Sequence, residues 1–224
     1  IVAIQTTLPD PINRITNSGD DSANTGTAGP GYKTVKVSSE QQVLRDKSRS
    51  GVSYRRINQY HMWKVDISYN KLTKSQFNTV YPFLLQRQAW QEAFFVNLPQ
   101  YDVTNRGVIA TSVASNLLQP AGQQYLEVVN DANIERGDLI TISDSTDNTH
   151  KKAYKITAVE SNKLYVSPTL QRKVDTTSAN GSPAITFNIA SPEMRVTCPS
   201  TNLDYTVDSS GLYTFSVKLE ETLS

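Results

Sequence analysis

Residues 62 to 98, MWKVDISYNKLTKSQFNTVYPFLLQRQAWQEAFFVNL, predict a strand, a helix and a second strand in succession. In the first part, apolar and polar residues alternate, which is the pattern of a strand with one buried face. The apolar members are Trp63, Val65, Ile67 and Tyr69. A last apolar run from Ala93 to Leu98, closed by Pro99, is short enough for a strand buried on both faces. The segment between these runs has a different period.

That middle segment predicts a helix. Thr73 followed three residues later by Gln76 forms a capping box, in which each side chain bonds a backbone N–H of the first turn. Apolar residues then recur at helical spacing, at Phe77, Val80, Tyr81, Leu84 and Leu85. We expect a helix over 73–90 that packs on the Trp63 face of the preceding strand. It should bend at Pro82, because proline lacks the N–H of a regular helical hydrogen bond.

The last strand signal of the chain matches the first. From Leu212 to Leu219 apolar and polar residues alternate, so we expect this strand to share a sheet with residues 63–69. Short apolar runs between residues 125 and 166, separated by turn residues, predict a small barrel or sandwich of hairpins. We therefore interpret residues 106–183 as an inserted β-rich, barrel-like module. The host domain would comprise residues 62–105 and 184–224, and the fold class is mainly β with one main helix.

Residues 1–61 are interpreted as an extended N-terminal arm with loops, because turn-forming residues separate sparse apolar ones. The candidate contacts with a neighbouring subunit are the apolar anchors Ile4, Leu8 and Ile12 and the basic residues Arg49, Arg55 and Arg56. The basic cluster favours a solvated surface segment or a docking arm. A nucleic-acid patch is the alternative, although Tyr54 is the only aromatic residue inside the cluster.

Composition bounds the classes of function. The 22 basic and 21 acidic residues leave a net charge of +1, so bulk charge does not indicate a nucleic-acid or anionic-membrane partner. The hydrophobic content of 38% is sufficient for a globular core. A single cysteine, Cys198, favours a reducing compartment. No apolar run approaches the roughly 20 residues of a membrane span.

The sequence predicts no enzyme, no cofactor and no metal site. His61 and His150 are far apart, and neither has a neighbouring ligand at a spacing that suits a metal. Asp144 and Asp147 lie in a polar loop that lacks the residue order of a calcium loop. Cys198 has no nearby basic residue to lower its pKa, so we expect a buried structural thiol.

The order of elements resembles that of distal-tail, tube-initiator and other minor tail or baseplate proteins of tailed bacteriophages. In the first half, the motifs that carry the resemblance are Trp63 before an apolar strand, Leu72-Thr73 at the helix start, Phe94-Phe95, and Leu98-Pro99. The chain departs from the family at the turn after the helix, where members often carry glycine and this chain has Ala89-Trp90.

The second half continues the resemblance through the Gly-Asp hairpin module from Ile134 to Leu170 and the closing segment from Tyr213 to Glu221. It implies a tail-tube-like β-sandwich flanked by one helix, assembled as a ring, commonly six-fold, around a channel that passes DNA. The implied partners are copies of the chain and neighbouring tail-tube, baseplate or tail-tip proteins, with DNA only in transit. The implied location is the virion tail, after assembly in the host cytoplasm.

The sequence is therefore compatible with two classes of function. The first is a virion structural protein that works by ring assembly and docking. The alternative is a non-enzymatic β-barrel binding module for nucleic acid or carbohydrate, with the basic cluster on phosphates or exposed aromatic residues on sugars. Particle mass, together with binding to DNA and glycans at several salt concentrations, separates the two.

Overall fold

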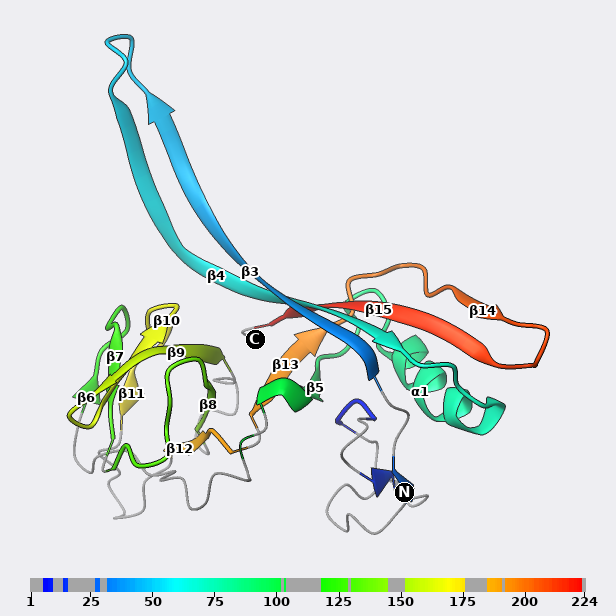
Figure 1. Ribbon diagram of the computed structural model, residues 1–224. Helices are drawn as coiled ribbons and strands as arrows, with labels where there is room; N and C mark the ends of the chain where they lie inside the picture. Colours follow the sequence, from blue (N-terminus) through cyan, green and yellow to red (C-terminus); the bar gives the residue numbers. More distant parts are fainter. Residues whose placement is uncertain are drawn as a thin grey trace. The chain divides into compact units, whose positions relative to one another are not determined.

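The structure, a computed structural model, describes residues 6–9, 14–15, 27–28, 32–101, 103, 118–128, 130–144, 152–175, 185–190 and 192–222. Within these residues the chain is mainly β with one α-helix, as expected from the sequence (Figure 1). It forms two compact units. The first comprises Ile1–Ser38, Lys64–Gln100 and Glu193–Thr222, and the second comprises Ser39–Trp63, Tyr101–Pro192 and Leu223–Ser224.

The first unit is built on a sheet with the strand order β3-β4-β15-β13-β5, in which β14 also pairs with β15. These strands are β3 (Tyr32–Lys47), β4 (Ser53–Tyr69), β5 (Phe94–Asn97), β13 (Glu193–Thr197), β14 (Tyr205–Val207) and β15 (Tyr213–Glu221). β4 and β15 are antiparallel, with Ser68 opposite Ser216 and Lys64 opposite Glu220. The expected pairing of these two distant strands is confirmed.

One face of this sheet forms the core of the first unit. Alternation places every second residue of the paired strands on this face, and six of these residues are at most 5% exposed: Val65, Ile67, Tyr69, Phe215, Val217 and Leu219. The ring of Tyr69 stacks on that of Phe215 with 4.6 Å between centroids. The alternation read from the sequence therefore identifies the buried face.

Helix α1 (Lys74–Gln86) begins at the predicted capping box. The backbone N–H of Gln76 donates to Thr73 Oγ1 at 3.4 Å, and the backbone N–H of Thr73 donates to Gln76 Oε1 at 3.0 Å. The helix packs on β15 through Phe77, whose ring stacks on Tyr213 at 4.4 Å and meets Phe215 edge-on at 5.8 Å. Aromatic pairs of this geometry add to the free energy of area burial.

The course of the helix differs from the prediction. It runs through Pro82 as one helix and ends at Gln86 rather than at residue 90. Both Pro82 and Asn78 are exposed, so water can bond the Asn78 carbonyl that proline leaves without a donor.

The buried stripe of α1 is also rotated from the expected one. Phe83 is buried, while Leu85 is 44% exposed. The ring of Phe83 meets the ring of Phe94 in β5 edge-on, with 5.3 Å between centroids. This contact turns the helix toward β5 and leaves Leu85 outside the core.

Within the predicted N-terminal arm, residues 32–61 lie mostly in two long strands rather than in loops, and much of residues 1–31 lies outside the described residues. β3 and β4, of 16 and 17 residues, form a long hairpin (Figure 1). Residues 39–61 are mostly polar, so they show no apolar alternation from which the strands could be recognised. Thr6–Leu8 adds to β5: the Phe95 N–H donates to the Thr6 carbonyl at 2.9 Å, and the Leu8 N–H donates to the Phe95 carbonyl at 2.8 Å.

The second unit contains a sheet with the strand order β12-β8-β9-β10-β7 and the short pair β6-β11. Its strands are β6 (Leu118–Gln119), β7 (Tyr125–Glu127), β8 (Leu139–Asp144), β9 (Ala153–Glu160), β10 (Lys163–Ser167), β11 (Val174–Asp175) and β12 (Ile185–Asn188). A two-residue turn with positive φ at Ser161 and Asn162 joins β9 to β10. The core includes Leu126, Ile140, Tyr154, Ile156, Leu164 and Phe187.

The boundaries of the units differ from those expected for the inserted module. The second unit includes residues 101–192 rather than 106–183, and it also takes Ser39–Trp63 from the hairpin. Trp63, expected to pack under the helix, belongs to this unit, and its indole N–H donates to the Ala153 carbonyl at 2.9 Å. The remaining described elements are β1 (Arg14–Ile15), paired with β2 (Thr27–Ala28), and the 3-10 helix η1 (Pro99–Tyr101).

Candidate functional site

The hairpin tip, defined as residues 43–54, exposes a set of large apolar side chains. Their exposed fractions are 40% for Val43, 65% for Leu44, 52% for Val52 and 62% for Tyr54. Val43 and Leu44 are neighbours in β3, so their side chains lie on opposite faces of the hairpin. Among the described residues, β15 pairs with β4 only from Lys64 to Ser68 and does not cover the tip. Contiguous exposed apolar patches are typical of interaction sites, which makes the hairpin tip a candidate.

Hydrogen bonds fix the turn at the end of the hairpin tip. The Ser48 N–H donates to the Val52 carbonyl and the Gly51 N–H donates to the Ser48 carbonyl, both at 2.9 Å. The hydroxyl of Ser48 also accepts from the Val52 N–H at 3.1 Å. Gly51 has a φ of +84°, which glycine adopts without the steric cost of a Cβ. The tip therefore presents its side chains from a defined backbone.

The hairpin tip is also basic. Arg45, Lys47 and Arg49 are exposed, and Asp46 is the one acidic residue among them. The Asp46 carboxylate accepts a hydrogen bond from the backbone N–H of Lys47 at 2.8 Å. The tip can thus combine apolar contact with ion pairing to carboxylates or phosphates.

The structure describes some of the candidate contact residues that were predicted from the sequence. Arg49 lies in the exposed turn of the hairpin tip, and Arg55 and Arg56 lie on β4, although their side chains are outside the described residues. Ile4 and Ile12 are also outside the described residues. Leu8 is 1% exposed and lies in the core of its own unit. It is therefore a core residue rather than the contact with a neighbouring subunit that we expected.

A second exposed surface, the turn surface, consists of Leu85 in the last turn of α1 and of Trp90 and Glu92, which follow the helix. Trp90 is 53% exposed and Leu85 44% exposed. Ala89 and Trp90 have φ angles of 58° and 66°, a left-handed conformation that costs non-glycine residues about 1 kcal/mol or more each. Such strain persists only where surrounding contacts impose it.

Three hydrogen bonds to the segment after β13 hold this strained turn. The Trp90 N–H donates to the Cys198 carbonyl at 3.1 Å, and the Ala89 N–H donates to the Ser200 carbonyl at 3.3 Å. The side-chain amide of Gln88 donates to the Thr201 carbonyl. The backbone therefore fixes the position from which the Trp90 indole projects.

A buried arginine lies beneath the same turn. The guanidinium of Arg87 sits 4.1 Å above the ring of Phe83, and its Nη2 lies 3.8 Å from Glu92 Oε2. Burial lowers the pKa of Arg87, and the Glu92 charge acts in the opposite direction. Glu92 remains 63% exposed, so its carboxylate can also meet a second cation.

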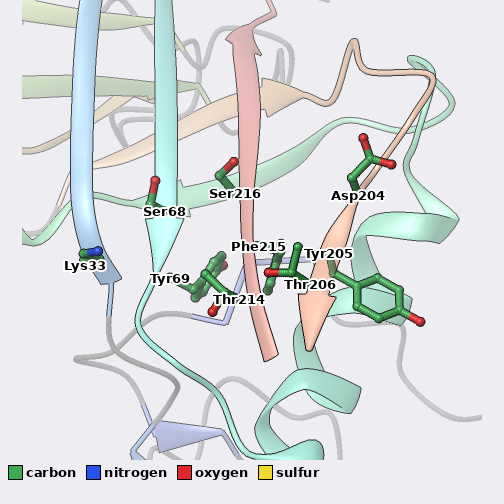
Figure 2. Close-up of a pocket in the computed structure, with 9 residues that line it drawn as sticks. All are labelled: Lys33, Ser68, Tyr69, Asp204, Tyr205, Thr206, Thr214, Phe215 and Ser216. Carbon is green, nitrogen blue, oxygen red and sulfur yellow. The ribbon is translucent and has the colours of Figure 1, made fainter. Parts of the chain in front are cut away.

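A shallow groove of about 340 Å³ lies on the exposed face of the first unit (Figure 2). Two cross-strand pairs of hydroxyl residues line it, Ser68 opposite Ser216 and Thr206 opposite Thr214. Lys33 and Asp204 lie at its sides (Figure 2). This lining can bond water or a polar ligand, but it offers no paired acid and base for catalysis.

His61 belongs to a buried polar cluster in the second unit. It is 3% exposed, and its Nε2 lies 2.9 Å from the hydroxyl of Ser39. The ammonium of Lys152 donates to the His61 carbonyl at 2.9 Å and lies 3.4 Å from Nδ1. Desolvation, followed by the charge of Lys152, lowers the pKa of His61 to about 4. The histidine is therefore neutral at physiological pH, which suits a structural role.

Cys198 is fully buried, and burial raises the pKa of its thiol. This environment keeps the thiol protonated and unreactive at neutral pH. Among the described residues, no group of three or more His, Cys, Asp or Glu side chains is placed to hold a metal ion. No helix in the described part of the chain is both long and apolar enough to cross a membrane.

No protein-family model matches the chain, and no curated protein sequence matches it significantly. Candidate functions are therefore inferred from the residues and their geometry.

The exposed apolar residues of the hairpin tip and the exposed Trp90 were not among the candidate residues predicted from the sequence. A signal for the first was present: Val43-Leu44 and Val52 flank the turn sequence Ser48 to Gly51, which favours a hairpin. For Trp90, the signal was the pair Ala89-Trp90 in a turn after the helix, where glycine would be easier to accommodate.

Proposed function

We propose that the protein is a structural subunit of a bacteriophage tail or baseplate, which forms a ring between the tail tube and the tail tip. The observation that carries the proposal is the long β3–β4 hairpin with its exposed, apolar and basic tip. A two-stranded ribbon is marginally stable in water unless other chain covers it. A tip with apolar side chains on both faces suits a subunit whose hairpin is covered in an assembly.

The motif residues support the same proposal. Trp63 is on β4, Leu72-Thr73 precede α1, and Phe94-Phe95 are in β5. The closing strand β15 pairs beside β4, and α1 packs on β15. This arrangement agrees with the sheet and flanking helix that the phage-tail resemblance implies. In such a ring the central channel would pass DNA, and the ring would dock on tail-tube and baseplate proteins.

The native mass of the protein tests the proposal. Light scattering coupled to gel filtration should give a closed oligomer, and negative-stain micrographs should show rings with a central opening. A protein that stays monomeric up to about 100 μM, well above the micromolar range of many specific contacts, would contradict the ring.

A nucleic-acid-binding module is the second candidate, favoured by the exposed cations Arg45, Lys47 and Arg49 of the hairpin tip. Binding through these residues would weaken steeply with salt, because phosphate contacts release counterions. A monomer that binds DNA, with a salt slope reduced by Arg49→Ala, would replace the ring by this function.

A further inference from the structure

We propose that the hairpin tip of one copy binds the turn surface of another copy, in a head-to-tail contact. The inference rests on the proposed ring function and deepens it by naming the two surfaces that meet. It follows from the complementary chemistry of the two surfaces and from the way each is held.

The turn surface presents an exposed tryptophan from a rigid backbone. Trp90 is 53% exposed on a backbone that three hydrogen bonds hold in a strained conformation. Tryptophan is enriched among the residues that dominate protein interfaces, because a large rigid ring loses little conformational entropy on binding. Leu85 extends the apolar area at the end of α1.

The charge of the turn surface is negative. Between residues 85 and 92, the ionisable side chains are those of Arg87 and Glu92. The Arg87 side chain is 3% exposed, whereas that of Glu92 is 63% exposed. An approaching surface therefore meets an indole, a leucine and a carboxylate.

The hairpin tip offers the opposite charge beside apolar side chains. Leu44, Val52 and Tyr54 supply the apolar area, and the exposed basic residues outnumber the one acidic residue by three to one. A guanidinium such as that of Arg49 can stack on the indole face of Trp90 and pair with Glu92. Opposite charges of this kind set the register and partner choice of an interface.

The two surfaces belong to different parts of the chain, so a contact between them is heterologous. After the first contact, one copy keeps a free turn surface and the other keeps a free tip. Repetition then closes a ring if the rotation between copies permits it, and otherwise forms an open filament.

Charge reversal tests the pairing directly. Arg49→Glu and Glu92→Arg should each weaken association roughly tenfold or more in sedimentation velocity, and the double variant should recover most of the loss. Lys74→Glu is the matched control, since Lys74 is exposed outside both surfaces. Recovery identifies direct contact, whereas two losses that simply add would overturn the pairing.

A mixing experiment tests the head-to-tail order. Trp90→Ala removes the indole of the turn surface, and Leu44→Asp places a charge among the apolar side chains of the tip. Each variant alone should therefore be monomeric. Mixed together, they should form a one-to-one dimer that grows no further, because one intact tip and one intact turn surface remain. Unchanged melting temperatures would show that both variants are folded.

The outcomes separate this inference from the proposed function. If the parent protein forms rings and Trp90→Ala forms the same rings, the turn surface is not the partner of the tip, and the ring function stands. If the parent is monomeric at all concentrations, both are overturned. Association of the parent that disappears on nuclease treatment would show that nucleic acid, rather than a second copy, occupies the tip.

Discussion

The buried polar cluster around His61 makes a specific prediction about stability and pH. In the folded protein the pKa of His61 is lowered to about 4, from 6.5 for an ordinary histidine. The unfolded chain therefore binds a proton at His61 between these two values, and the folded chain does not. Stability should fall as the pH drops below 6.5 and should stop changing from this cause below pH 4.

The size of the effect follows from the pKa difference. A shift from 6.5 to about 4 corresponds to a total loss of about 3 kcal/mol, since one pKa unit is about 1.4 kcal/mol. At pH 5, where the unfolded histidine is almost fully protonated, the loss relative to pH 8 should be about 2 kcal/mol. Above pH 7 both states are neutral at this residue, and it contributes no pH dependence.

Urea unfolding of the parent and of His61→Gln at pH 8 and pH 5 measures this contribution. Glutamine keeps polar atoms near Ser39 and Lys152 but does not titrate. His150 and the carboxyl groups are present in both proteins, so their effects cancel in the comparison. The variant should lose about 2 kcal/mol less than the parent between the two pH values. Equal losses would refute the assignment of a neutral, buried His61.

Three further predictions concern backbone and packing. Ala89→Gly should raise the free energy of unfolding by about 0.5–1 kcal/mol, since glycine relieves the left-handed strain at a cost in unfolded-state entropy. Ala158→Gly, in the exposed part of β9, is the control and should lower the free energy of unfolding. If both variants are less stable than the parent, the backbone at residue 89 is not strained. Thr73→Ala should cost about 1 kcal/mol through the lost helix cap, measured in urea, and no change would mean that the cap is not formed. Trp63→Ala should lower the free energy of unfolding by about 3–5 kcal/mol, and Trp63→Phe should lower it less. A decrease under roughly 1 kcal/mol for Trp63→Ala, measured by thermal or urea unfolding, would show that the indole lies outside a core.

The sequence was informative where one face of an element is apolar. The strand from Trp63 to Tyr69, the capped helix start at Thr73 and the closing strand each repeat a clear period, and each is confirmed. In these elements burial of one face determines the register, because a shift by one residue would expose the whole apolar set. The partner of Trp63 was missed, because periodicity identifies the buried face and not the element that covers it.

The long hairpin was missed for the converse reason. Residues 39–61 of β3 and β4 carry mostly polar side chains, and the few apolar ones at the tip are exposed rather than alternating toward a core. Hairpin formation there depends on the turn from Ser48 to Gly51 and on cross-strand hydrogen bonds, which leave a weak trace in composition. Trp90 gave no periodic signal either, because its environment is set by bonds to the distant Cys198 and Ser200.

The stability of the fold and the proposed assembly depend on different residues. Trp63 and Phe77 are buried in the two units, so changes there should unfold the chain before they reveal anything about association. The apolar residues of the hairpin tip and Trp90 bury little in the single chain, so their removal should leave the melting temperature nearly unchanged. Exposed apolar side chains at two ordered turns do not add to the stability of the monomer in water. Their selective effect on association, without a change in folding, is what an assembly role requires.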